Sequence, residues 1–179
     1  MSEPTVNVEH SSESLHVDTY EAWWIRVTLL VIVVMILAII VSSFAYGIQL
    51  PGVAGRVVPN TLNEPGNPFA EPGLRELAPG KYEVYMVAQA WAFTPGSITV
   101  PAGSQVTFYV TSRDIQHGLK IVDTNVNFMV LPGQISTLTA IFDTPGTHNI
   151  ICHEYCGIAH HTMFGQVVVE AAPEPASTN

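Results

Sequence analysis

The sequence predicts a mainly β protein in which an antiparallel β-sandwich follows one N-terminal transmembrane helix. Three observations support this fold class: a long apolar stretch near the N-terminus, short runs of alternating polar and apolar residues after position 81, and turn signals between those runs. Alternation with a period of two is typical of half-buried strands, and regularly spaced turns favour a sandwich. About 90 residues carry this pattern, which is enough for one hydrophobic core.

Residues 1–21 are acidic and Ser-rich, and we expect them to form a flexible or partner-docked tail. Residues 22–47 are predicted to form the transmembrane helix, because they are apolar apart from Arg26 and a few hydroxyl residues and exceed the about 20 residues that a span needs. Trp23 and Tyr46 lie at its ends, where aromatic residues occupy the headgroup region. A cleaved signal peptide is the alternative, but signal peptides begin with basic residues, and the first 21 positions contain no Lys or Arg. We therefore expect a retained anchor.

Residues 48–80 are rich in Pro and Gly, which predicts an extended connector between membrane and domain that could lie along a partner subunit. Residues 81–171 are predicted to form the sandwich, and the Ala- and Pro-rich residues 172–179 a disordered tail. Predicted strands within the sandwich include 82–88, 97–100, 105–111, 136–142 and 147–151, separated by turns that contain Pro and Gly.

The loop from Cys152 to Met163 concentrates two cysteines, histidines and a methionine just before the strand-like run 164–169. Soft sulfur ligands with imidazole suit copper. One thiolate serves a mononuclear blue copper site, whereas two thiolates on a short loop can bridge a pair of metals. We interpret the loop as part of a dinuclear copper electron relay.

Such a site needs a second imidazole from elsewhere in the chain. His117 is our first choice because it follows the strand 105–111, and loops at strand ends carry function on a rigid scaffold. His148 is the alternative, but it lies within a predicted strand, where a solvated or capping role is expected. His153 and His161 are expected to face solvent or a partner and are left out of the ligand set.

Two structural roles compete with copper binding. Cys152 and Cys156 could form a disulfide, which exported domains favour, but the accompanying His160, Met163 and His117 make this the weaker interpretation. A structural zinc site normally uses two pairs of ligands at short spacing, and Met163 would serve no purpose in it.

The pattern Cys-x-Glu-x-Cys-Gly-x-x-His-x-x-Met with an upstream histidine resembles the CuA motif of cytochrome c oxidase subunit II. The resemblance covers nearly the whole chain, since the order of anchor, connector and cupredoxin-like sandwich is also similar. It implies a centre of two copper ions that are held by His117, Cys152, Cys156, His160, Met163 and the backbone carbonyl of Glu154. The single helix resembles the B-type heme-copper oxidases more than the two-helix A-type subunits.

The resemblance also implies partners and a location. The copper domain would lie on the outer (periplasmic or extracellular) face of a prokaryotic cytoplasmic membrane, anchored by a single pass. It would accept electrons from a soluble donor, either cytochrome c or a small blue copper protein, and pass them to heme in subunit I. The hemes and a further copper would lie only in subunit I, where O2 reduction is coupled to proton translocation. After the membrane segment the chain has ten acidic and five basic residues, which favours a basic electron donor. The sequence contains no basic patch of the kind that binds nucleic acid.

Three residues have individual roles by resemblance. Trp91 lies in a stretch similar to the aromatic stretch that docks the donor, so it is our candidate for electron entry, with a core tryptophan as the alternative. Glu21 resembles a glutamate at the entrance of the proton channel in B-type oxidases, with a solvated acid as the alternative. The Glu154 side chain resembles an acid that binds magnesium at the subunit I interface in A-type oxidases, although B-type members often lack it.

Other functions remain open at this point. The chain could be the CuA subunit of a nitric oxide reductase, or a membrane-anchored protein that binds or delivers copper. Nitrous oxide reductase has a similar site, but there it is fused to a much larger catalytic domain, and quinol oxidases lack these ligands.

Overall fold

The computed structural model describes residues 18–171, so residues 1–17 of the predicted tail 1–21 and the whole predicted tail 172–179 lie outside the described residues. The chain divides after Tyr46 into a helical unit and a β unit. Each unit is described by itself below.

Helix α1 spans Thr19–Ala45, a few residues earlier than the predicted 22–47. It begins early because Asp18 caps it: the Asp18 carboxylate accepts a hydrogen bond of 2.9 Å from the backbone N–H of Tyr20. Its 27 residues correspond to about 40 Å at 1.5 Å per residue, which exceeds the thickness of the hydrocarbon layer. The helix is long and apolar enough to cross a membrane, and it buries none of its residues.

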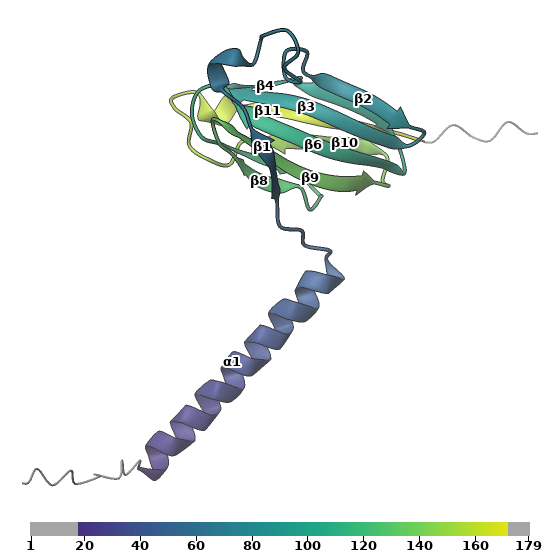
Figure 1. Ribbon diagram of the computed structural model, residues 1–179. Coiled ribbons are helices and arrows are strands. Elements are labelled where there is room, and N and C mark those ends of the chain that lie inside the picture. Colours follow the sequence, from purple (N-terminus) through teal and green to yellow (C-terminus); the bar gives the residue numbers. More distant parts are fainter. Residues whose placement is uncertain (1–17, 172–179) are drawn as a thin grey trace, which may run out of the picture. The chain divides into compact units, whose positions relative to one another are not determined.

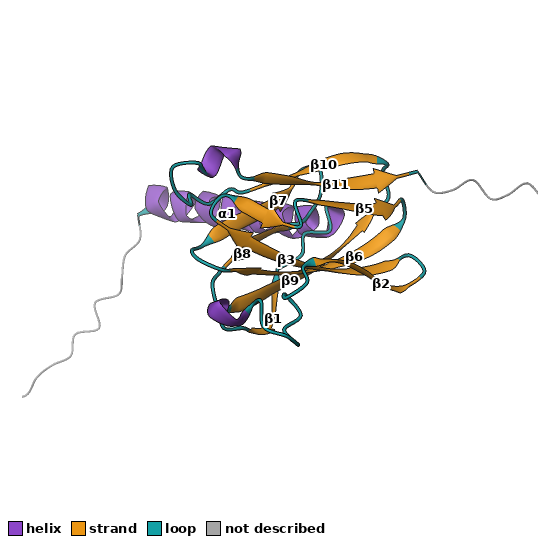
Figure 2. Cartoon of the chain, turned by 90° about the horizontal axis from the view of Figure 1, so that it is seen from above, coloured by secondary structure: helices purple, strands orange, loops and turns teal. Residues whose placement is uncertain are grey.

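The β unit is a sandwich, and Figure 2 shows its two layers. Within the described residues, one sheet has six strands in the order β1-β9-β6-β3-β2, with β4 beside β3, and the other has five in the order β5-β11-β10-β7-β8. Figure 1 shows the first sheet nearest the viewer. The strands of the first sheet are β1 (Gly52–Arg56), β2 (Gly73–Ala78), β3 (Lys81–Gln89), β4 (Ala92–Thr94), β6 (Ser104–Ser112) and β9 (Gln134–Phe142). Those of the second are β5 (Ser97–Pro101), β7 (His117–Ile121), β8 (Asn127–Val130), β10 (Gly146–Ile151) and β11 (Phe164–Glu170).

Most neighbouring strands are antiparallel, as predicted, but β3 pairs with β6 and β5 pairs with β11 in parallel. Alternation has the same period in both arrangements, so the sequence pattern cannot distinguish them. The parallel register runs from Lys81 beside Gln105 to Ala88 beside Ser112. The carboxyl ends of β3 and β6 therefore lie at the same edge, which brings the stretch of Trp91 close to the loop before His117.

The main hydrophobic core lies between the two sheets and contains the side chains that the alternating patterns place inward, such as Val84, Phe108, Ile121 and Val167. Cys152, Cys156 and Met163 belong to the same buried cluster. The sulfur atoms of the cysteine loop are therefore part of the core at one end of the sandwich.

The segment predicted as an extended connector, 48–80, is instead folded into the sandwich. It supplies β1, which pairs with β9, and β2, which pairs with β3. Between them a short 3-10 helix, η1 (Pro59–Thr61), begins at Pro59, and Leu62 and Phe69 are fully buried against Val87 in a second cluster. The prediction was wrong because the Pro and Gly residues mark tight turns here, and two isolated apolar residues give no periodic signal.

Candidate metal centre

His117, the first residue of β7, is completely buried. Its Nε2 lies 2.9 Å from Oδ1 of Asp114. Its Nδ1 is buried and has no hydrogen-bond partner among the described residues. Buried polar atoms are normally satisfied, and a ring with its proton on Nε2 has a lone pair on Nδ1. This nitrogen is therefore free to bind a metal, and the Asp114 carboxylate fixes the ring that carries it.

The cysteine loop begins directly after β10 and brings both thiols to His117. Sγ of Cys152 and Sγ of Cys156 are 3.9 Å apart, and both cysteines are buried and reduced. A ligand atom of His117 and the two sulfur atoms all lie within 4.8 Å of one another. Atoms at these separations can bind the same metal ions with only small adjustments.

The remaining predicted ligands complete this group. Nδ1 of His160 lies 3.4 Å from Sγ of Cys156, and Sδ of Met163 lies 3.7 Å from the same sulfur. The thiol of Cys152 donates to the backbone carbonyl of Glu154 at 3.2 Å, which directs that oxygen toward the site. The structure thus brings together all six atoms that the sequence predicted as ligands, and their sulfur, imidazole and carbonyl chemistry fits copper.

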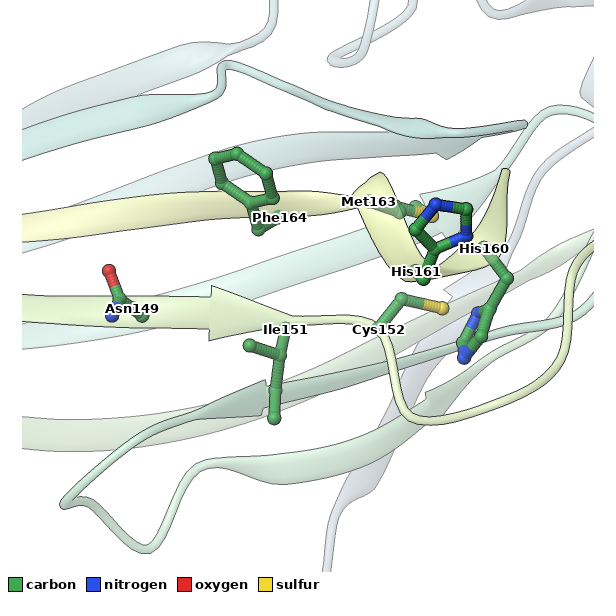
Figure 3. Close-up of a pocket in the computed structure, with 7 residues that line it drawn as sticks. All are labelled: Asn149, Ile151, Cys152, His160, His161, Met163 and Phe164. Carbon is green, nitrogen blue, oxygen red and sulfur yellow. The ribbon is translucent and has the colours of Figure 1, made fainter.

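Three backbone features hold the loop in this shape. The 3-10 helix η2 (His160–Thr162) turns the chain back toward β11, and the N–H of Cys152 donates to the carbonyl of Met163 at 3.2 Å. Gly157 adopts a φ of 116°, a left-handed conformation that favours glycine. Figure 3 shows Cys152, His160 and Met163 together beyond the ends of β10 and β11, where they line a surface pocket of about 340 Å³.

The surroundings of Cys156 oppose ionisation of its thiol. Burial and the neighbouring Cys152 thiol raise the pKa of Cys156 to about 11. Burial also opposes ionisation of Asp114, but hydrogen bonds from His117 and from the backbone N–H groups of Ala90 and Ile115 outweigh it and lower the pKa of Asp114. The site thus offers one fixed carboxylate, and it needs bound cations to ionise the thiol of Cys156.

Trp91 lies on the surface next to the predicted ligands. The residue is 40% exposed, and its indole N–H donates to the backbone carbonyl of Cys156 at 3.2 Å. Gly157 makes room for it, since a Cβ at this glycine would lie 3.2 Å from Nε1 of the indole. Trp91 is therefore partly exposed and is hydrogen-bonded to the cysteine loop.

The other histidines lie outside the ligand group. The two ring nitrogens of His148 each lie 3.3 Å from a backbone carbonyl, those of Val122 and Thr144. His153 and His161 are exposed, and the His153 ring packs on Gly118, where a Cβ would overlap it.

Glu21 and Glu154 are the predicted carboxylates. Glu154 is half-buried between the two cysteines, and Glu21 is exposed in the first turn of α1, in the other unit.

Sequence analysis missed Asp114. The available signal was its spacing of three residues before His117 in a turn, which allows the carboxylate to reach the ring.

Comparisons with known proteins show related sequences over most of the chain. Residues 81–172 match the family model described as cytochrome C oxidase subunit II, periplasmic domain. The chain is 37% identical over 155 residues to cytochrome c oxidase subunit 2 of Thermus thermophilus, which covers 84% of this chain and 92% of that protein. A similarity of 35% over 96 residues to nitrous-oxide reductase of Stutzerimonas stutzeri covers 51% of this chain but only 15% of the reductase.

A solved structure is similar over most of the chain. A chain in the cryo-EM structure of a heme-copper terminal oxidase dimer has a TM-score of 0.69 and 29% sequence identity, and the match covers 84% of this chain and 99% of that one. The family model and the near-complete coverage of the Thermus subunit lead to one conclusion: this chain belongs to the cytochrome c oxidase subunit II family.

Proposed function

We propose that this chain is the electron-entry subunit of a heme-copper oxidase and that it carries electrons on a dinuclear copper centre. The observation that carries the proposal is the unpartnered, buried Nδ1 of His117 beside two thiols 3.9 Å apart. Cys152, Cys156, His117, His160, Met163 and the backbone carbonyl of Glu154 would together hold the copper ions.

Two copper ions held by these residues would supply one-electron transfer with little change in ligand positions. The protein's part is to keep the ligands fixed. Cys152, Cys156 and Met163 are packed in the core, and interiors are close-packed. Asp114 holds the His117 ring through Nε2 and stays ionised in doing so.

The donor would approach the face that carries Trp91. Ile115, Tyr155 and Ile158 are exposed by 45%, 75% and 85%. Tyr155 and Ile158 belong to the cysteine loop, to which the Trp91 indole donates a hydrogen bond, and Ile115 belongs to the loop before His117. The backbone N–H of Ala90 donates to Asp114 at 2.6 Å, which ties the Trp91 stretch to the His117 loop. These exposed apolar side chains in the adjoining loops, together with the half-exposed indole, support Trp91 as the point of electron entry from cytochrome c or a small blue copper protein.

The membrane side of the proposal rests on α1 and on the family. The copper domain would lie outside a prokaryotic cytoplasmic membrane and would pass electrons to heme in subunit I, where O2 is reduced and protons are translocated. Glu21, in the first turn of the helix, would mark the proton entrance, since ionisable groups at membrane boundaries are functional candidates. The half-buried Glu154 side chain could contribute to a magnesium site with ligands from subunit I.

The test is electron delivery in the assembled oxidase. Reduced donor is mixed anaerobically with the wild-type complex and with complexes that carry His160→Gln or the neighbouring control His161→Gln. We expect His160→Gln to abolish donor-driven heme reduction and the exposed His161→Gln to leave it within about twofold of wild type. Equal heme reduction rates in the wild-type and His160→Gln complexes would show that electrons enter elsewhere.

A further inference from the structure

The segment 57–71 between β1 and β2, called the brace below, is fastened to the outer face of the first sheet. Leu62 and Phe69 are buried in it, and the backbone N–H of Val57 donates to the carbonyl of Gly133 at 3.2 Å. The Asn67 side chain closes the brace on itself, since its amide donates to the carbonyl of Thr61 and its oxygen accepts from the N–H of Phe69, both at 3.0 Å. The brace is thus an ordered element and can transmit a positional constraint.

Two arginines bind the brace. The Arg75 guanidinium, on β2, donates to the carbonyls of Pro68 and Glu71 at 2.9 and 3.3 Å and stacks over the Tyr85 ring at 4.4 Å. The Arg113 guanidinium donates from Nη2 to Oδ1 of Asn63 at 2.8 Å. Arg75 thus joins the brace to a strand, whereas Arg113 joins it to a loop.

That loop is the one that carries the His117 ligand. The backbone N–H of Arg113 donates to the carbonyl of Ala88 at 2.9 Å, and the next residue, Asp114, holds Nε2 of His117. Arg113 Nε is shielded from solvent and has no partner among the described residues, so the side chain lies against the protein and is not simply solvated. A displacement of Arg113 would therefore be transmitted to the His117 ring through Asp114 alone.

We infer that Arg113 and Asn63 are positioning residues for the metal centre: they hold the His117 loop against the brace and so preset the His117 ring before metal binds. The importance of this contact for electron transfer rests on the proposed function, but the presetting of the loop does not. The competing interpretation is that the contact is a surface hydrogen bond that contributes only to global stability.

The experiment uses the full chain in detergent and the variants Asn63→Ala, Arg113→Met and Arg75→Met. The Arg75 variant is the matched control, since it removes an arginine that binds the same brace without touching the His117 loop. In the metal-free protein, hydrogen exchange of the amides 112–118 is expected to accelerate about tenfold in Asn63→Ala and Arg113→Met and to stay at the wild-type rate in Arg75→Met. In the copper-loaded protein, the loss of copper to a chelator should accelerate about tenfold in the same two variants. Removal of a group that orients a metal ligand typically weakens metal binding about 10–100-fold, and we expect the lower value. Arg113→Lys, which can still reach Asn63, should restore most of the protection.

Exchange at the wild-type rate in both Asn63→Ala and Arg113→Met would overturn the inference. So would an equal acceleration in Arg75→Met, since the effect would then be general loosening. If the wild-type chain does not take up copper, the proposed function fails, while the exchange comparison in the metal-free protein still decides whether the brace presets the loop.

Discussion

The substitution Phe69→Ala tests whether the brace is part of the folded core. Phe69 is completely buried, contacts Leu62 and Val87 in the second cluster, and packs edge-on against Tyr85 with ring centroids 5.5 Å apart. Truncation of a buried phenylalanine destabilises by about 3–5 kcal/mol, because apolar contacts are lost and a cavity remains. Half-buried Tyr85 and Tyr109 border the cluster and can relax into the gap, so we expect about 3 kcal/mol.

The assay is reversible thermal unfolding of the metal-free β unit, residues 47–179, with the thiols kept reduced. At this size a loss of about 3 kcal/mol lowers Tm by roughly 10 °C. The control is Leu77→Ala on β2, which is 63% exposed and should change the free energy of unfolding by less than about 0.5 kcal/mol. If Phe69→Ala unfolds at the same midpoint as Leu77→Ala, the segment is a loose connector and our account of the brace is wrong.

Four further predictions concern the metal centre. Asp114→Asn removes the carboxylate that fixes the His117 ring, so copper should dissociate about 10–100-fold faster in a chelator assay; a wild-type rate would contradict the role of Asp114. Trp91→Phe keeps an aromatic ring but loses the hydrogen bond to Cys156. Electron uptake, measured by stopped flow, should slow about tenfold, while the free energy of unfolding should fall by no more than about 1.5 kcal/mol. An unchanged rate of uptake would show that electrons do not pass through Trp91. Burial raises the pKa of Cys156 to about 11, so the thiol is protonated in the metal-free protein and copper binding must release that proton. The copper affinity should therefore rise about tenfold per pH unit between pH 6 and 8. A copper affinity that does not change with pH would refute this. Because of the same raised pKa, the folded state at alkaline pH retains a proton that the unfolded chain has released. The metal-free wild type should therefore lose stability relative to Cys156→Ser as the pH rises from about 9 toward 11. Parallel curves of unfolding free energy against pH for the two proteins would contradict this.

The sandwich was predictable where side chains alternate. The strands β3, β6 and β9 have one buried face each, and their patterns of alternation located them within a residue or two. The segment 48–80 was not predictable in the same way, because its buried residues Leu62 and Phe69 are isolated between turn residues. Parallel pairing was equally invisible, since it depends on contacts between residues distant in the sequence.

The ligand group could be predicted because its chemistry is local. Most of it lies within one loop, and the distant His117 was found among seven histidines by its place after a strand. The partners of the ligands were not found. Asp114 and Arg113 act through hydrogen bonds to residues that the fold brings near, such as Ala90 and Asn63, and no spacing rule identifies such contacts. The identity of the ligands can thus be predicted from the sequence of the loop, whereas the contacts that hold them in place depend on the tertiary fold.

The most direct test of a dinuclear centre is electron paramagnetic resonance, with copper stoichiometry, on the copper-loaded β unit. An unpaired electron shared equally by two copper nuclei gives seven hyperfine lines, and one localised on a single nucleus gives four. We expect two coppers per chain and the seven-line pattern, with Cys152 and Cys156 both unavailable to thiol reagents. One copper per chain with four lines, or no copper with the two cysteines joined in a disulfide, would contradict the account.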